Sequence, residues 1–370
     1  MDDRIRKLAK NLVNYCIELK PKEKVLINAR DADLNIVKAL IEEIHNIGGY
    51  PYLNLVSSEI TRDLILNCCE DYLKTSVDVS MYQMKLMDAH ISIRGEKNCF
   101  ELSDIPEEKI QMYNKMFDSV QKERVKNTKW TLVMCPSYAL AQSAKMSTQK
   151  YEDFFYKICN LDYSKMSKAM DNLVKLMNET DKVRLVAPNT DISFSIKDIS
   201  AVKCAGKNNI PDGEVFTAPV RESVNGFITY NINTTYNGVY FSNVRLEVKK
   251  GKIVKATASK NTDILNTILD TDENARYFGE FAIGVNPYIT EPFNEVLFDE
   301  KMKGSIHFTP GSCYEGEANN GNISAVHWDM VLSMQPQHGG GEIYFNDKLI
   351  RKDGIFVIPE LESLNPEKLL

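Results

Sequence analysis

Several common signatures are missing from this 370-residue sequence, and each absence excludes a class of protein. The eight cysteines include no CxxC pair and no regular spacing, which argues against a disulfide framework. No run of about 18 apolar residues is present, so no membrane-spanning helix is expected. No GxGxxG or P-loop string occurs, which excludes the common nucleotide-binding motifs.

Charge and length narrow the choice further. The net charge of -6 argues against a nucleic-acid surface, and a small ligand is the expected partner. Residues 1–19 have the pattern of an amphipathic helix rather than a signal peptide, so we expect a cytoplasmic protein with no membrane association. A chain of 370 residues is expected to form two domains.

The amino-terminal half alternates strand-like and helix-like segments, an order typical of a parallel sheet. The expected strands are 24–29, 52–56, 89–94 and 130–135, and the expected helices are 33–47, 80–87, 106–126, 148–159 and 164–178. We therefore predict an α/β domain with a mostly parallel sheet over residues 1–180. Arg94 ends one of these strands, where such sheets usually bind ligands, although a single arginine there is more often simply exposed.

The composition changes at Asp181, after which Gly, Asn, Thr and β-branched residues dominate. Strands are expected at 183–187, 192–196, 226–232 and 238–248, with a helix at 261–269 and hairpin turns at Asn237-Gly238 and Lys250-Gly251. Residues 181–370 are therefore predicted to form a strand-rich α+β carboxy-terminal domain.

The residues with the clearest chemical meaning lie between Gly304 and Asp329, in the string GSIHFTPGSCYEGEANNGNISAVHWD. This stretch holds two of the five histidines of the chain, His307 and His327, together with Tyr314. His327 and Asp329 are two positions apart, so on an extended strand both side chains leave the same face and can bind one metal ion.

Two further carboxylates stand in apolar surroundings, Glu214 in GEVFTAP and Glu280 in FGEFAIGVNP. Burying such a carboxylate is unfavourable unless it is paired or bound to a metal. Together with His307, His327 and Asp329 they make three oxygen and two imidazole ligands, a set that suits Zn, Co or Mn and is too rich for one tetrahedral ion. Two ions sharing carboxylates would suit hydrolysis of a terminal peptide bond.

These strings, with the His307 and Tyr314 pair and HWDM, resemble the metal-binding signatures of the metallo-aminopeptidase family that includes aminopeptidase T, AmpS and PepS. The resemblance implies metal ligands at the five positions just named, with Glu280 also catalytic, and a functional tyrosine at Tyr314. It further implies peptide substrates, two divalent ions (Zn, Co, Mg or Mn), removal of amino-terminal residues, and a homodimer whose active sites open into an enclosed cavity.

Other readings stay open at this point. His307, His327 and Asp329 alone form a two-histidine, one-carboxylate set that suits a mononuclear Fe(II) ring-cleaving dioxygenase, and a non-catalytic metal-binding or peptide-binding protein is a third possibility. Glu315 and Glu317 could act as a general base but are expected to be solvated, and Cys313 could be a thiolate ligand. The side-chain preference, the native metal and the general base are not readable from the sequence.

Overall fold

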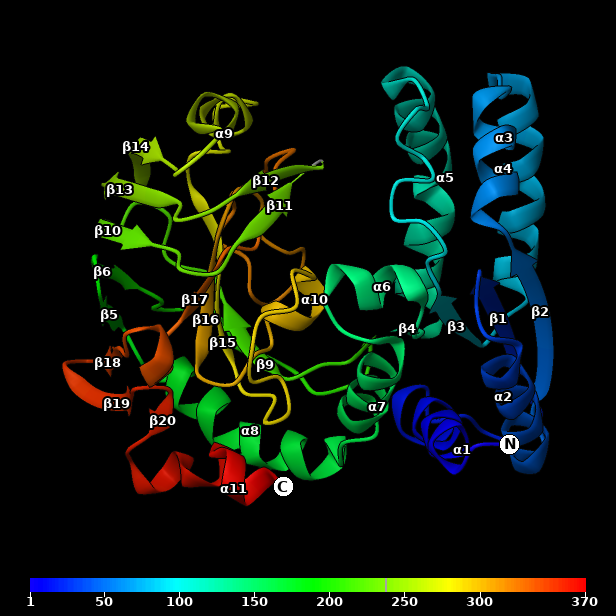
Figure 1. Ribbon diagram of the computed structural model, residues 1–370, viewed down its shortest axis with the longest axis horizontal. Coiled ribbons are helices and arrows are strands. Elements are labelled where there is room, and N and C mark those ends of the chain that lie inside the picture. The colour runs from blue at the N-terminus through cyan, green and yellow to red at the C-terminus, as the bar shows by residue number, and fades with distance from the viewer. Residues whose placement is uncertain (237) are drawn as a thin grey trace. The chain divides into compact units, whose positions relative to one another are not determined.

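The computed structural model describes residues 1–236 and 238–370 and forms two compact units (Figure 1). Unit 1 comprises Met1–Leu161 and Gly206–Pro211, and unit 2 comprises Asp162–Ala205 and Asp212–Leu370. Each unit is described by itself below. The division into folding domains at residue 180 stays a prediction.

Unit 1 is built on a parallel sheet with the strand order β2-β1-β3-β4-β8. Its strands are β1 (Lys24–Arg30), β2 (Tyr50–Val56), β3 (Ala89–Arg94), β4 (Lys129–Met134) and β8 (Asn209–Ile210). Its helices are α1 (Asp3–Lys10), the π-helical η1 (Asn11–Cys16), α2 (Leu34–Ile47), α3 (Ser58–Leu66), α4 (Glu70–Lys85), α5 (Glu107–Asn127), α6 (Tyr138–Ser143) and α7 (Thr148–Cys159). The parallel sheet confirms the expected α/β class of this part of the chain.

The ends of α2 show how local sequence sets an element. The Asp33 side chain accepts a hydrogen bond from the Asn35 backbone N–H and so caps the first turn. Gly48 ends the helix with a φ of 81°, a conformation that glycine adopts without strain. The helix expected over 33–47 is therefore confirmed.

The helical region before β3 was predicted poorly. A helix was expected only over 80–87, whereas the structure has α3 and the 16-residue α4. These two helices bury few side chains, among them Ile65, Leu73 and Met84, so their hydrophobic periodicity in the sequence is weak.

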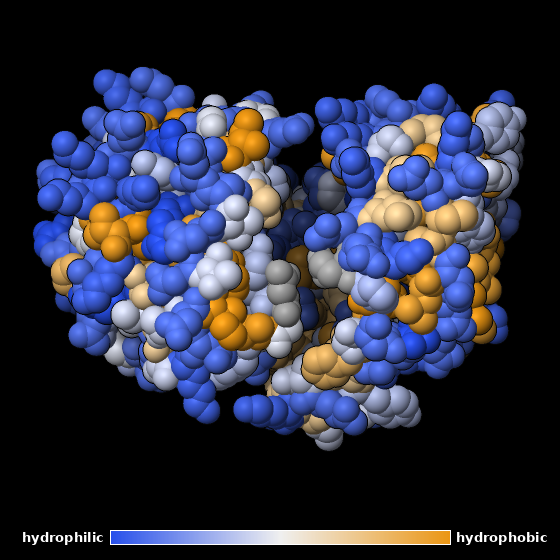
Figure 2. Space-filling view, turned by 90° about the horizontal axis from the view of Figure 1, so that it is seen from above, coloured by the Kyte–Doolittle hydropathy of each residue, from blue (hydrophilic) through white to orange (hydrophobic). Residues whose placement is uncertain are grey.

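Strand β2 lies at the edge of the sheet and exposes apolar side chains, including Tyr52, Leu53 and Leu55. Figure 2 shows hydrophobic side chains gathered among hydrophilic ones on unit 1. An exposed apolar edge strand is a possible contact surface for another chain.

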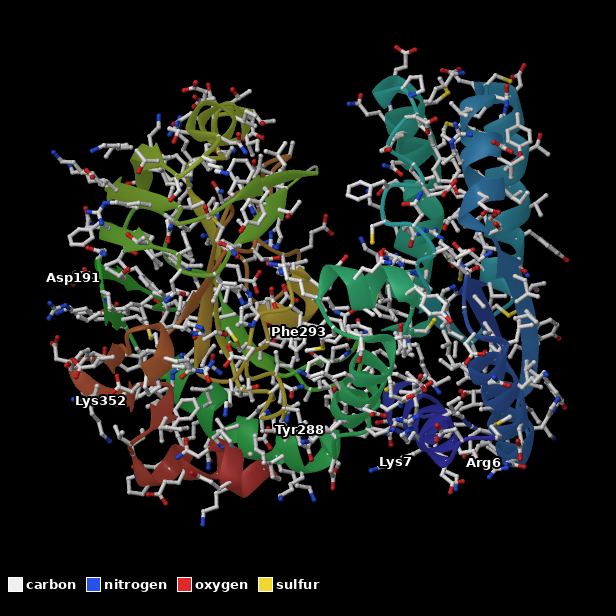
Figure 3. All side chains as sticks on the ribbon, viewed as in Figure 1. Arg6, Lys7, Asp191, Tyr288, Phe293 and Lys352 are labelled. Carbon is white, nitrogen blue, oxygen red and sulfur yellow. The ribbon has the colours of Figure 1, made fainter. Side chains whose placement is uncertain are left out.

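Helix α1 is amphipathic, as expected. Ile5 and Leu8 are buried, whereas Arg6 and Lys7 are exposed at the periphery of unit 1 (Figure 3). No helix in the described part of the chain is long and apolar enough to cross a lipid bilayer.

Unit 2 contains two large antiparallel sheets, a two-stranded antiparallel sheet of β11 (Thr234–Tyr236) and β12 (Val239–Phe241), and the helix α8 (Tyr163–Asn178). The eight-stranded sheet has the order β14-β13-β10-β6-β5-β18-β19-β20, with β5 (Lys182–Ala187), β6 (Thr190–Ser195), β10 (Asn225–Thr229), β13 (Arg245–Lys249), β14 (Lys252–Thr257), β18 (Glu342–Phe345), β19 (Lys348–Lys352) and β20 (Ile355–Phe356). The five-stranded sheet has the order β17-β16-β15-β9-β7, with β7 (Val202–Cys204), β9 (Glu214–Thr217), β15 (Phe278–Gly284), β16 (Ser305–Pro310) and β17 (Val331–Ser333). Smaller elements are α9 (Thr262–Leu269), α10 (Val296–Asp299), η2 (Pro336–His338), η3 (Pro359–Leu364) and α11 (Pro366–Leu369).

Aromatic side chains fill the space between the two large sheets of unit 2. Phe194 of β6 lies 4.8 Å, centroid to centroid, from Phe308 of β16 and 5.0 Å from Phe281 of β15. All residues of β15 and β16 are buried. The sheet that carries the candidate site is therefore held rigidly by this core, and the strand-rich class expected for this half is confirmed.

Two strand predictions in unit 2 need correction. The strand expected over 238–248 is broken into β12 and β13, because Asn243 adopts a left-handed φ of 49° between them. The strand expected over 226–232 ends earlier, with β10. The Lys250-Gly251 turn is confirmed between β13 and β14, with φ of 49° and 78°. Asn237 of the other expected turn lies outside the described residues.

Candidate metal centre

Three neighbouring strands of the five-stranded sheet carry the first part of the site. Glu214 begins β9 and pairs with Gly284 of β15, while His307 of β16 pairs with Ala282 of the same strand. Glu280 lies on β15, between these two strands. All three ionisable side chains are buried, with exposed fractions of 6% for Glu214, 2% for Glu280 and 1% for His307.

The second part comes from the segment that returns along the end of β16. His327 forms an isolated antiparallel bridge with Gly311, so the expected strand is reduced here to a single bridge. The His327 Nε2 atom lies 3.3 Å from Asp329 Oδ1 and 3.5 Å from Glu280 Oε2. His327 and Asp329 therefore face the same space, as the spacing of the two residues predicted.

A close approach of backbone segments makes this arrangement possible. Gly311 has a φ of 102°, and a Cβ atom built on it would lie 2.0 Å from the Val326 carbonyl oxygen. A Cβ on Gly279 would lie 2.2 Å from the carbonyl oxygen of Ser312. Only glycine fits at these two positions, which bring the His327 segment against the strands that carry the buried candidate ligands.

The predicted ligands form two overlapping clusters. Ligand-type atoms of Glu214, Glu280 and His307 lie within 4.8 Å of one another, and so do those of Glu280, His327 and Asp329. Glu280 is the residue common to both clusters. The structure thus brings all five predicted metal ligands together in unit 2.

Three buried atoms of these clusters have no hydrogen-bond partner among the described residues, which is the arrangement expected of cation ligands. Glu214 Oε2, Glu280 Oε2 and His327 Nε2 are buried and make no hydrogen bond among the described residues. The ion-pair distances of 3.3 to 3.7 Å around them are short, but the geometry is not that of a hydrogen bond. Unsatisfied buried polar atoms are unfavourable by about 1–3 kcal/mol each, so a divalent cation fits this donor set.

Backbone carbonyls orient both histidines. The His327 Nδ1 atom lies 2.7 Å from the Ser312 carbonyl oxygen, and His307 Nδ1 lies 3.3 Å from that of Glu300. In a neutral ring, an Nδ1–H that donates to a carbonyl leaves the Nε2 lone pair free. For both histidines Nε2 is then directed toward Glu280, the arrangement common in metal-binding histidines.

The pKa values of the metal-free cluster are shifted because several ionisable side chains are buried close together. Burial raises the pKa of Glu214 and of Glu280. Burial alone would lower the pKa of His307, but the Glu214 and Glu280 carboxylates raise this pKa to about 10. The pKa of His327 is likewise raised to about 9, against the effect of burial, by Asp329 and Glu280. Despite burial, the pKa of Asp329 is held below its usual range by the adjacent His327 imidazole and by the charge of His307. In the metal-free state, protons therefore occupy the site that a cation would take.

Two residues of the site were missed by sequence reasoning. Glu300 forms a further ligand-type cluster with His307 and Asp329, and its carboxylate pairs with the buried Lys301 ammonium. Lys301 is 1% exposed and its Nζ atom lies 3.4 Å from Glu214 Oε1. Both stand in the charged string FDEKMKG, which reads as a solvated turn, so no local signal could have identified them.

The remaining candidates are placed less centrally. Tyr314 is 49% exposed, and its ring centroid lies 5.2 Å from that of His327 in an edge-on contact. Glu315 and Glu317 are exposed. Cys313 belongs to no ligand-type cluster of the described residues, and its thiol donates to Asn319 Oδ1 at 3.2 Å. A different cysteine, Cys204, forms a ligand-type cluster with Asp212 and Glu214.

Several known proteins are similar to parts or most of this sequence. Aminopeptidase T of Thermus thermophilus is 34% identical over 142 residues, 34% of each chain, and aminopeptidase AmpS of Bacillus subtilis is 37% identical over 112 residues, 29% of this chain and 26% of AmpS. These matches span about a third or less of the relatives' lengths. Aminopeptidase PepS of Streptococcus thermophilus is 20% identical over 384 residues, 89% of this chain and 92% of PepS.

A solved structure, wild-type AmpT from Thermus thermophilus, superimposes with a TM-score of 0.80 at 20% identity, over 96% of this chain and 99% of that one. At this identity the likeness establishes the fold. A family model described as thermophilic metalloprotease (M29) matches residues 1–355. The match covers nearly the whole sequence, and the chain therefore belongs to the thermophilic metalloprotease family M29.

Proposed function

We propose that this protein is a metal-dependent aminopeptidase that uses two divalent cations to hydrolyse the amino-terminal peptide bond of peptides. The observation that carries the proposal is the position of Glu280, which belongs both to the Glu214 and His307 cluster and to the His327 and Asp329 cluster. A carboxylate shared by two ligand sets is what a dinuclear centre requires. Relatives named aminopeptidases support the reaction type.

The two clusters divide the ligands between them. Glu214, Glu280 and His307 would hold one cation, and Glu280, His327 and Asp329 the other. The unpartnered atoms Glu214 Oε2, Glu280 Oε2 and His327 Nε2 are available as donors. Bound Zn, Co, Mg or Mn would polarise the peptide carbonyl and supply a hydroxide nucleophile near neutral pH.

The protein groups around this centre orient ligands and substrate. The Thr309 hydroxyl donates to Asp329 Oδ1 at 2.7 Å, and the Ser312 carbonyl holds the His327 ring, so both ligands are fixed before substrate binds. Tyr314, packed on the edge of that ring, is the candidate donor of a hydrogen bond to the oxyanion that forms during attack. A cavity of about 130 Å³ borders Asp329 and offers room for part of a substrate.

The other readings are less favoured. A mononuclear ring-cleaving dioxygenase needs two histidines and one carboxylate, and it has no use for Glu214 and Glu280 beside them. A non-catalytic binding protein would be expected to have lost a ligand, but all five predicted ligands cluster in unit 2.

Metal analysis and hydrolysis together test the proposal. We expect about two divalent ions per chain after anaerobic purification and hydrolysis of aminoacyl-p-nitroanilides with added Co²⁺ or Zn²⁺. Glu280→Gln should abolish hydrolysis, because it removes the shared carboxylate. Glu273→Gln removes an exposed carboxylate seven residues before Glu280 and serves as the matched control. One iron per chain, with oxygen uptake on a pyridine diol, would overturn the proposal.

Assembly and location complete the proposal. A homodimer is expected, and the exposed Tyr52, Leu53 and Leu55 on edge strand β2 offer an apolar surface for it. Light scattering of the wild type and of Leu55→Lys tests this interface, since a dimer built on β2 should become a monomer in the variant. A cytoplasmic location stays a prediction.

A further inference from the structure

Unit 1 has an unusually polar face on its two central strands. Central strands of a parallel sheet are normally apolar on both faces. Along β1 and β3, residues on an apolar face alternate with residues on a face that is largely polar. The apolar face carries Val25, Ile27, Ala29, Ala89, Ile91 and Ile93, and the other face carries Leu26, Asn28, Arg30, His90, Ser92 and Arg94. Burying these polar side chains in a core would be energetically unfavourable, whereas a polar face suits a binding site.

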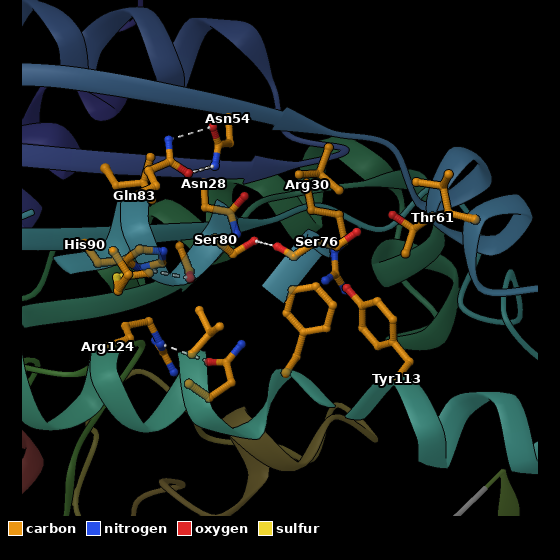
Figure 4. A pocket seen from close by; sticks show the side chains of 18 of the residues that line it. Asn28, Arg30, Asn54, Thr61, Ser76, Ser80, Gln83, His90, Tyr113 and Arg124 are labelled. Carbon is orange, nitrogen blue, oxygen red and sulfur yellow. Dashed lines mark hydrogen bonds between the residues drawn. The ribbon is translucent and has the colours of Figure 1, made fainter. Parts of the chain in front are cut away.

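This polar face lines a cavity of about 350 Å³. Helices α3, α4 and α5 supply the remaining walls, and Figure 4 shows side chains of the sheet and of α5 directed into the space between them. The ionisable groups in the lining are basic or phenolic, with the arginines Arg30, Arg94 and Arg124 and the imidazole of His90. Among the residues whose side chains are described, no Asp or Glu lines it, although the whole chain has more acidic than basic residues.

The three arginines are not neutralised by carboxylates. None of them forms an ion pair among the residues whose side chains the structure describes. Arg30 and Arg94 are register partners at the ends of β1 and β3. Arg94 is an exposed residue as a whole, yet partial burial of its guanidinium group lowers its pKa, as does Arg30, and Glu96 has a smaller opposing effect. Like charges held together in this way are stabilised by an anion.

Arg124 of α5 adds an unsatisfied donor. Its Nε donates to Gln121 Oε1 at 3.1 Å, but its Nη1 is buried without a hydrogen-bond partner in the described part of the chain. Burial and the charge of Arg94 lower the pKa of Arg124. Burial, and then Arg124, lowers the pKa of His90 to about 3, so this imidazole is neutral and can donate or accept one hydrogen bond.

The sheet topology places this site where ligands bind in related architectures. After β1, the chain adds β2 on one side of it and then β3 on its other side. The order in which strands are added therefore reverses between β1 and β3, which is a topological switch point. Ligands of open α/β sheets bind outside the carboxyl ends of the strands at such a switch point. Arg30 and Arg94 are the last residues of the two strands that flank it.

We propose that this cavity binds a small organic anion that carries a phosphate or carboxylate group together with hydroxyl groups. Guanidinium groups recognise the charged end through paired N–H donors. Asn28, Ser92 and Tyr113 provide hydrogen-bonding groups for the rest of the molecule. A volume of 350 Å³ is roughly ten times the ~30 Å³ share of one water, so the occupant is larger than a bare inorganic ion. The site shares no residue with the metal centre and does not depend on the proposed hydrolysis.

Calorimetric titration of the full-length, metal-free chain tests the proposal. One arm uses inorganic phosphate and glucose 6-phosphate, and the other uses malate and tricarballylate. Saturable binding of one ion per chain is expected in at least one arm, and the arm that binds identifies the charged group. Arg94→Gln and Arg124→Gln should each weaken binding about tenfold or more, the effect of losing one charge-assisted hydrogen bond.

Controls separate a binding defect from a folding defect. Arg6→Gln removes one positive charge from exposed α1 of the same unit and should leave the affinity unchanged (Figure 3). The Arg124 guanidinium lies 4.6 Å from the Trp130 ring centroid, so binding should alter tryptophan fluorescence, and Trp130→Phe should abolish this signal while calorimetric binding persists. Absence of saturation in both arms, or wild-type affinity in folded Arg94→Gln and Arg124→Gln, would overturn the proposal.

Discussion

Replacing Glu280 with glutamine is expected to stabilise the metal-free protein and to remove its response to divalent cations. The Glu280 side chain is 2% exposed, its Oε2 has no hydrogen-bond partner among the described residues, and burial raises its pKa. Glutamine keeps an oxygen near His307 Nε2, which lies 3.3 Å from Glu280 Oε1, and removes the buried charge. Removing the negative charge of this buried, incompletely hydrogen-bonded carboxylate should stabilise the metal-free protein by about 1–3 kcal/mol.

The expected increase in Tm for Glu280→Gln, and its dependence on pH, follow from this free-energy estimate. For a unit of this length, 1 kcal/mol shifts Tm by about 2–4 °C, so the metal-free variant should melt roughly 2–12 °C higher. Because the folded pKa of Glu280 is raised above its unfolded value, the wild type loses stability as the pH rises through the folded pKa. The advantage of the variant should therefore be small near pH 4 and full at high pH.

Thermal unfolding after chelation, and again with added Co²⁺, measures both effects. Cobalt at about a hundred times its Kd should stabilise the wild type by about 2.7 kcal/mol and the variant by much less. Glu273→Gln, a change at an exposed carboxylate, should behave like the wild type in both conditions. A metal-free Glu280→Gln protein that melts below the wild type, or an unchanged cobalt shift, would refute the reasoning.

Acid should weaken the fold through His90, whose pKa is lowered to about 3 by burial, whereas the unfolded value is about 6.5. The unfolded state binds the proton first, so about 1.5 kcal/mol is lost between pH 6.5 and 5, and urea unfolding of His90→Gln should lack this loss. Cobalt binding at pH 7 should release about two protons, because the pKa values of metal-free His307 and His327 are raised to about 10 and 9. Binding heats that do not vary with the ionisation enthalpy of the buffer would contradict this. Gly311→Ala should cost about 2–4 kcal/mol in denaturant unfolding, since its Cβ would lie 2.0 Å from a carbonyl oxygen. Gly316→Ala, with a φ of 131° and open space around its Cβ, is the control for backbone strain alone.

The sequence was informative where chemistry is local. The turn at Lys250-Gly251, the helix over 33–47 and the alternation of strands and helices in unit 1 follow from residue preferences, and the structure confirms them. Helix α3 and the first ten residues of α4, before the expected helix 80–87, were missed because a helix with a small buried face leaves little periodic pattern. The break at Asn243 was missed because one left-handed residue has no distinctive signature in a polar segment.

The metal-ligand set illustrates the same division. Glu214 and Glu280 were identifiable because a carboxylate in an apolar string is unusual, and the structure brings both to His307. Glu300 and Lys301 were not identifiable, because a charged pair in a charged string looks solvated until the fold buries it. The roles assigned to these residues await the metal and activity measurements.

By itself, the sequence determined the class of each half and the identity of the strongest candidate ligands, because secondary-structure periodicity and unfavourable buried charge are properties of short segments. Only the tertiary structure decided that Glu280 lies in two clusters, that Glu300 joins them, and that Arg30, Arg94 and Arg124 line one cavity. These arrangements depend on strand register and topology, which join residues far apart in the chain.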